Sequence, residues 1–76
     1  MLNRVNVSVS EVKDADGNIR PKVLHWHDGR EWLIDRVLHI SRSPDGDYAG
    51  TRYTVLIAGM EKYLYRDGKQ WYVDAA

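Results

Sequence analysis

Three histidines are the residues of this chain best suited to bind a metal ion. His25 and His27 lie two positions apart, so on a strand their imidazoles would project from one face, with His39 as a third nitrogen ligand. A three-nitrogen set leaves one coordination position open for water. Nothing in the sequence brings His39 to the pair, and Glu31 is a nearby partner for a surface imidazole. We therefore predict solvent-facing histidines and no metal, and keep a metal-dependent activity as a third hypothesis only.

Nucleophilic and acid–base catalysis find little support in the pattern. The chain has no cysteine, and none of its serines stands in a Gly-x-Ser-x-Gly context. The glycines are scattered singly, so no glycine-rich loop can surround a phosphate. Acid–base catalysis by two carboxyl groups needs environments that separate their pKa values, whereas most carboxylates here fall in turns or on mixed-charge stretches. We predict that the protein is not an enzyme and carries no cofactor.

The aromatic residues give the strongest indication of binding. Three Trp and five Tyr occur without any Phe, so every aromatic side chain has a polar group suited to a wet edge. Trp26 near Arg30, and Tyr65 near Lys69, predict cation–π pairs close to two hairpin tips. These aromatic side chains could stack on the bases of single-stranded nucleic acid. The simpler interpretation is that they pack against side chains of neighbouring strands.

Arginines around the turn at Pro44 form the only locally basic stretch. Arg36 interrupts the apolar face of its predicted strand, so it should lie at a barrel mouth or pair with Asp35 or Asp74. The residues that we select as a speculative binding set are Trp26, Arg30, Arg36, Arg42, Arg52 and Tyr65.

Composition limits the class of protein. Seventy-six residues fit a single domain, 1–76, and a hydrophobic fraction of 43% argues against intrinsic disorder. Eleven basic residues balance eleven acidic ones, whereas nucleic-acid-binding domains are usually basic. No apolar run approaches the ~20 residues of a membrane helix, and no signal peptide is visible. We expect a protein of the cytoplasm.

Turn signals predict the elements that position these residues. Asp-Gly occurs at 16–17, 28–29, 45–46 and 67–68, between segments rich in Val, Ile, Tyr, Trp and Thr. The predicted strands cover about 3–13, 18–27, 30–42, 48–58, 61–66 and 69–74. The fold class is therefore all-β: a small antiparallel meander of about six strands, rolled into a partly open, SH3-like barrel.

A repeat helps to choose between strand and helix for residues 30–41, where a helix beginning at Asp28 is the alternative. Residues 28–35 and 67–74 match in residue type, and the second copy leaves too little chain for a stable helix. We therefore predict strands in both copies. Three-residue turns would pair Trp26 with Arg30 and Tyr65 with Lys69. A bulge at Gly50 would then complete a core of Leu24, Trp32, Ile34, Leu38, Ile40, Tyr53, Val55, Ile57, Tyr63, Trp71 and Val73.

One stretch of the chain resembles a known pattern. Pro21, then Trp26, then Gly29-Arg30 and the aromatic Trp32 follow the spacing Pro-x(4)-Trp-x-x-Gly-Arg-x-aromatic, and residues 67–73 read Asp-Gly-x-x-Trp-x-Val. This pattern is similar to that of a family of small bacterial domains of unknown function. Some members of that family are linked with DNA-repair polymerases, so the resemblance implies a nucleic-acid or repair-complex role.

Two functional hypotheses remain besides the metal site. The first is a non-enzymatic β-barrel binding module that engages a protein or nucleic-acid partner. The alternative is an assembly domain without a ligand, in which an edge strand makes a weak homodimer. Residues 3–10, where Val alternates with Asn and Ser, could pair with a second copy if they form such an edge.

Overall fold

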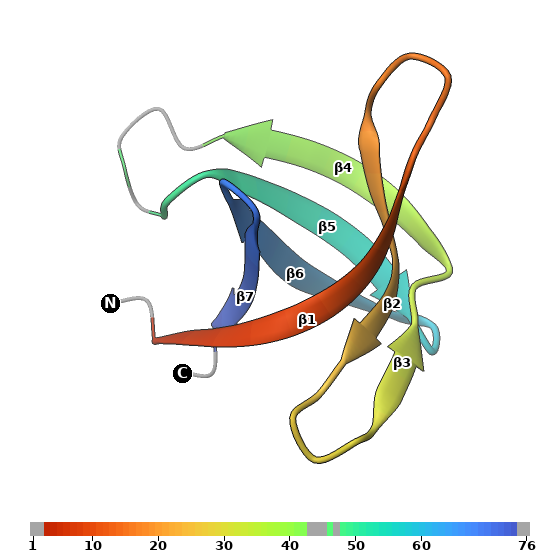
Figure 1. Ribbon diagram of the computed structural model, residues 1–76, viewed down its shortest axis with the longest axis vertical. Coiled ribbons are helices and arrows are strands. Elements are labelled where there is room, and N and C mark those ends of the chain that lie inside the picture. The colour runs from red at the N-terminus through yellow and green to blue at the C-terminus, as the bar shows by residue number, and fades with distance from the viewer. Residues whose placement is uncertain (1–2, 43–45, 47, 75–76) are drawn as a thin grey trace.

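All strands in the described part of the chain belong to one antiparallel sheet. The computed structural model describes residues 3–42, 46 and 48–74. Its seven strands lie in the order β3-β2-β1-β7-β6-β5-β4, and the sheet curls into a half-barrel (Figure 1). The strands are β1 (Arg4–Lys13), β2 (Ile19–His25), β3 (Glu31–Leu33), β4 (Arg36–Arg42), β5 (Thr51–Ile57), β6 (Met60–Asp67) and β7 (Gln70–Asp74).

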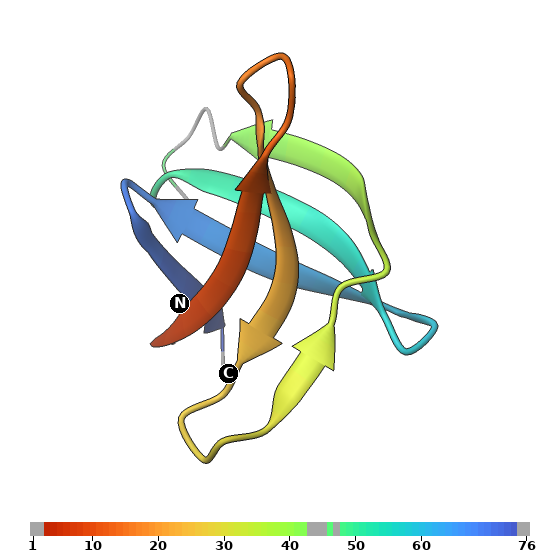
Figure 2. The same ribbon diagram turned by 45° about the vertical axis from the view of Figure 1, so that its right-hand side comes forward.

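The barrel is held together by its first and last strands and is open between β3 and β4. β1 pairs with β7 through Arg4–Val7 and with β2 through Ser8–Lys13, so in the strand order it lies between these strands and not at the edge that the predicted homodimer would use. The edges are β3 and β4, which are linked by the corner at Ile34 and Asp35 (Figure 2). There the backbone N–H of Ile34 donates to the Lys22 carbonyl and that of Asp35 to the Leu56 carbonyl.

The predicted all-β class and partly open barrel are confirmed, with two changes. The segment 30–42 divides into β3 and β4, which raises the number of strands to seven. The helical alternative for 30–41 is wrong, because both parts form strands. The division follows from the corner at Ile34, whose side chain is buried while its backbone turns away from β2 toward β5.

The two copies of the repeat form different turns. In the first, the Trp26 N–H donates to the Arg30 carbonyl, and Leu24 lies opposite Trp32, as predicted. In the second, Asp67 pairs with Gln70 across a tight two-residue turn, so the predicted pairing of Tyr65 with Lys69 is wrong. Arg66 consequently lies opposite Trp71, with its guanidinium 5.7 Å from the ring centroid.

This change of register alters the core. Of the predicted core, Leu24, Ile34, Tyr53, Val55 and Trp71 are buried, and Trp32, Ile57 and Val73 are half-buried against them. Tyr63 is 53% exposed, because the tight turn directs the adjacent Leu64 inward instead. The structure adds Val7, Leu64, Tyr65 and Tyr72 to the buried hydrophobic residues.

One bulge lies in β4 and another where β1 pairs with β2, between Ser10 and Glu11, and Gly50 lies outside the strands. Val37 pairs with Val55, and the register shifts before His39 pairs with Thr54, so Leu38 is the extra residue. Leu38 and Ile40 are 41% and 51% exposed, contrary to their predicted place in the core. An edge strand has a neighbour on one side only, so its apolar residues retain contact with solvent.

A second apolar layer covers the outer, convex face of the sheet. Tyr65 and Tyr72 pair across β6 and β7 and stack with ring centroids 4.9 Å apart and planes 8° apart. Tyr48 approaches the Tyr65 ring edge-on at 5.3 Å and is hydrogen-bonded to Ser41. The protein therefore packs aromatic side chains on both faces of one sheet. No helix among the described residues is long and apolar enough to cross a membrane.

Candidate binding pocket

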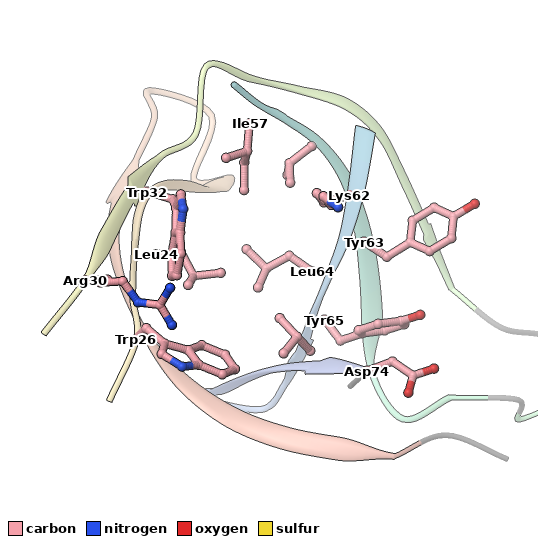
Figure 3. A pocket seen from close by; sticks show the side chains of 12 residues that line it. Leu24, Trp26, Arg30, Trp32, Ile57, Lys62, Tyr63, Leu64, Tyr65 and Asp74 are labelled. Carbon is pink, nitrogen blue, oxygen red and sulfur yellow. The ribbon is translucent and has the colours of Figure 1, made fainter. Parts of the chain in front are cut away.

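An open cavity of about 520 Å³ lies in one mouth of the half-barrel, and we call it the mouth pocket (Figure 3). One wall comes from β2, β3 and the turn between them, and the opposite wall from β5, β6 and β7. Its volume lies within the usual range of small-ligand pockets. The lining residues are Leu24, Trp26, Arg30, Trp32, Val55, Ile57, Lys62, Tyr63, Leu64, Tyr65, Val73 and Asp74.

The first wall is built by the Trp26–Arg30 turn. Trp26 follows β2 directly, and its backbone is fixed by the hydrogen bond to the Arg30 carbonyl. Trp26 and Trp32 pack edge-to-face, with ring centroids 6.2 Å apart and planes 77° apart. Both indoles are half-buried, so each keeps part of its surface available to a ligand.

The second wall contains an aliphatic floor and one cation. Lys62 pairs with Val55, so the two side chains share the concave face of the sheet. Val55 and Leu64 are almost completely buried and close the inner end of the mouth pocket. Figure 3 shows the side chains of Tyr63 and Tyr65 on the far side of β6, pointing away from the cavity.

Two positive charges face each other across this apolar space. The Arg30 guanidinium lies 5.2 Å from the centroid of Trp32, and its Nε is 2.6 Å from a carboxylate oxygen of Asp28. Within the described part of the chain, no carboxylate lies at ion-pair distance from Lys62. Arg30 and Lys62 are therefore the two cations of the mouth pocket, whose lining also includes the carboxylate of Asp74.

The carboxylates near the pocket are held in other interactions. The backbone N–H of Arg30 donates to Asp28, which lowers the pKa of that carboxyl, and the Arg30 side chain lowers it further. Asp74 accepts a hydrogen bond of 3.0 Å from the backbone N–H of Asn3. Both carboxylates thus already serve as hydrogen-bond acceptors for their neighbours.

The six residues of the predicted binding set occupy three places. Trp26 and Arg30 lie together in the mouth pocket, although Arg30 stacks on Trp32 instead of Trp26. Arg36 and Arg42 are exposed at the two ends of the edge strand β4, where Arg36 pairs with Leu56. Arg52 and Tyr65 pair on the convex face. The set therefore does not form one continuous surface.

On the convex face, Arg52 is fixed by aromatic rings. Its guanidinium carbon is 4.4 Å from the Tyr63 centroid and 5.1 Å from that of Tyr48. Tyr65 is 5% exposed, and burial raises the pKa of its phenol. This arrangement is a packed layer in which few aromatic faces remain free to stack on a ligand.

Two of the three histidines, His27 and His39, are exposed as predicted, whereas His25 is half-buried. His25 contacts Glu31 at 2.7 Å through Nδ1 and Ser10 at 2.6 Å through Nε2, so both ring nitrogens have partners. His39 pairs with Thr54 on another part of the sheet. Among residues 3–42, 46 and 48–74, no group of three His, Asp or Glu side chains could hold a metal ion.

Trp32 and Lys62 are among the lining residues that were missed as binding residues. Trp32 was assigned to the core, because its apolar character does not distinguish a lining residue from a buried one. Lys62 faces the cavity only through its pairing with Val55, which depends on the turn at 58–59. Counting outward from a two-residue turn at Ala58 and Gly59 pairs Lys62 with Val55, and this pairing could have identified Lys62 from the sequence.

Comparison with known proteins leaves the structure as the basis for function, since no family model, curated protein or solved structure matches the chain. The resemblance of residues 21–34 and 67–73 to small bacterial domains accordingly remains a prediction.

Proposed function

We propose that the protein is a non-enzymatic binding module that recognises a protein partner by taking one of its apolar side chains into the mouth pocket. The observation that supports this most directly is the cavity itself, with the half-buried indoles of Trp26 and Trp32 on one wall and aliphatic side chains on the other. Half-buried aromatic residues around an apolar recess are the typical anchor sites of protein interfaces.

The distribution of charge favours a protein over nucleic acid as the partner. The arginines of the predicted binding set are divided among the mouth pocket, β4 and the convex face. A single-stranded nucleic acid would need a continuous positive groove with free aromatic faces along its path. The nucleic-acid role implied by the sequence resemblance is the second candidate.

A ¹H–¹⁵N NMR titration with two series of probes separates these candidates. One series contains acetylated, amidated tripeptides whose central residue is Leu, Trp or Ser, and the other contains single- and double-stranded oligonucleotides at low and physiological salt. We expect the Leu and Trp peptides to shift the indole N–H signals of Trp26 and Trp32 and to leave that of the buried Trp71 in place. The Ser peptide should have no effect at the same concentration.

The opposite pattern would replace the proposal. Shifts by oligonucleotides that persist at physiological salt on Trp26, Arg30, Arg36, Arg42, Arg52 and Tyr65 would support nucleic-acid binding instead. Peptides that shift no signal of the mouth pocket would show that the proposed site is wrong. The assembly alternative predicts concentration-dependent shifts without any probe, and they should lie on the edge strands β3 and β4.

A further inference from the structure

We infer that the ligand of the mouth pocket is the C-terminus of a partner chain, with an apolar last residue in the cavity and its free carboxylate between Lys62 and Arg30. This inference rests on the proposed function and specifies the chemistry of the partner. It depends on three features of the pocket: its two cations, its closed inner end and its apolar walls.

The cations set the charge of the ligand. Lys62 extends from β6, and Arg30 comes from the turn between β2 and β3, so the two charges approach from facing walls. In Figure 3 the Arg30 guanidinium is directed into the cavity between Trp26 and Trp32. The contact with Asp28 uses the Nε of Arg30 and leaves its terminal amino groups as donors, so a carboxylate placed between Lys62 and Arg30 would accept charge-assisted hydrogen bonds.

The closed inner end determines how a peptide can enter. Leu24, Val55 and Leu64 belong to the buried core cluster and form the floor of the mouth pocket, so an extended chain cannot pass through the barrel. A side chain must therefore enter from the mouth. When that side chain belongs to the last residue of a chain, the carboxylate remains at the rim, at the level of the two cations.

The walls select an apolar residue. Indole and aliphatic groups offer few hydrogen-bond donors or acceptors, so burying a polar side chain against them would leave it unsatisfied. Leu or Trp would bury most of its surface there. We therefore expect a terminal Leu or Trp to bind more tightly than a terminal Ser or Asp.

The experiment compares peptides that differ in one chemical group. The first probe is Ac-Gly-Ser-Gly-Leu with a free carboxylate, and the second is the same peptide with a C-terminal amide. From the usual strength of an exposed ion pair, we expect the carboxylate form to bind about two- to fivefold more tightly at low salt. The difference should shrink as salt is added, because exposed charges are screened.

Two variants test the role of Lys62. Lys62→Gln should reduce the preference for the carboxylate and leave the affinity for the amide unchanged. Lys69→Gln, in the exposed turn between β6 and β7, removes the same charge away from the pocket and should keep the preference. A preference that survives Lys62→Gln in full would overturn the role assigned to Lys62.

The remaining outcomes separate this inference from the proposed function. Equal binding of both peptides would show that the C-terminal carboxylate is not recognised, and the proposed apolar pocket would stand. Binding of neither peptide would refute the pocket itself. A third probe, an amidated peptide with Asp beside an internal Leu, places the charge on a side chain. If it binds as well as the free C-terminus, the ligand is an internal acidic segment and the inference is wrong.

Discussion

The phenol of Tyr72 donates a hydrogen bond of 2.7 Å to the backbone carbonyl of Ala49, which joins the last strand of the sheet to the segment before β5. Tyr72 is fully buried, and the Arg4 guanidinium covers its ring at 4.2 Å. One side chain thus connects β1, β7 and the segment leading to β5 on the convex face.

Removing this hydroxyl should lower the free energy of unfolding. For Tyr72→Phe we expect a loss of about 1 kcal/mol, because one hydrogen bond disappears while ring stacking on Tyr65 remains. Tyr63→Phe is the matched control, since that phenol belongs to a side chain that is 53% exposed, and it should have little effect. Urea denaturation of both variants would measure the difference, and equal stabilities would contradict the assigned contact.

Alkaline pH should destabilise the protein through the same layer. Burial raises the pKa of Tyr65 and Tyr72 above the ordinary value of 10.0, so their neutral forms are favoured in the folded state. The stability that each phenol contributes is fully present below its pKa in the unfolded chain, and it is lost as pH rises through its higher pKa in the folded protein. We therefore expect the melting temperature to fall above about pH 10. The double variant Tyr65→Phe, Tyr72→Phe should show a weaker fall, and an unchanged slope would argue against the two phenols.

Gly50 should be much less tolerant of substitution than Gly59. Both have positive φ, of 81° and 77°, so alanine is strained at either position. A Cβ at Gly50 would overlap the carbonyl group of Arg66, whereas a Cβ at Gly59 meets open space. We expect about 1 kcal/mol of destabilisation for Gly59→Ala from backbone strain. Gly50→Ala should cost about 3 kcal/mol or more, because the β6 backbone must move. Similar melting temperatures for the two variants would contradict the close approach.

The sequence predicted the fold class because its strongest signals were local. Asp-Gly pairs between β-rich segments mark turns whatever the rest of the chain does, and the turn from Trp26 to Arg30 forms as predicted. The turn after Asp67 carries the same dipeptide but adopts another geometry. There, pairing Arg66 with Trp71 also brings Glu11 within 2.7 Å of the indole nitrogen, a contact between strands distant in sequence. Local patterns contain no information about such a contact.

The same limit applies to the site. Trp26 and Arg30 were identified from one turn, where their spacing alone brings them together. Lys62 could not be identified this way, because its position in the pocket depends on the curvature that brings β6 opposite β3. Arg52 and Tyr65 were selected as binding residues, but the register pairs them with each other on the convex face instead of placing Tyr65 beside Lys69.

The edge strand β4 carries charges that oppose self-association. Arg36 and Arg42 stand at its two ends, and an antiparallel pair of β4 strands centred on His39 would place Arg36 of each copy opposite Arg42 of the other. Like charges at such positions destabilise a sheet, and charged residues commonly protect edges in this way. The exposed side chains of Leu38 and Ile40 would otherwise favour pairing.

Reversing one of these charges should therefore create a dimer. In Arg36→Glu, each glutamate would face Arg42 of the second copy, so two repulsive pairs become attractive, and self-association should tighten by about tenfold. Lys69→Glu makes the same change of net charge away from β4 and should leave the oligomeric state unchanged. Sedimentation equilibrium over a series of concentrations measures the effect. A wild-type protein that already dimerises through β4 would contradict the protective role of the arginines and favour the assembly alternative, because the edge would then tolerate its own like charges.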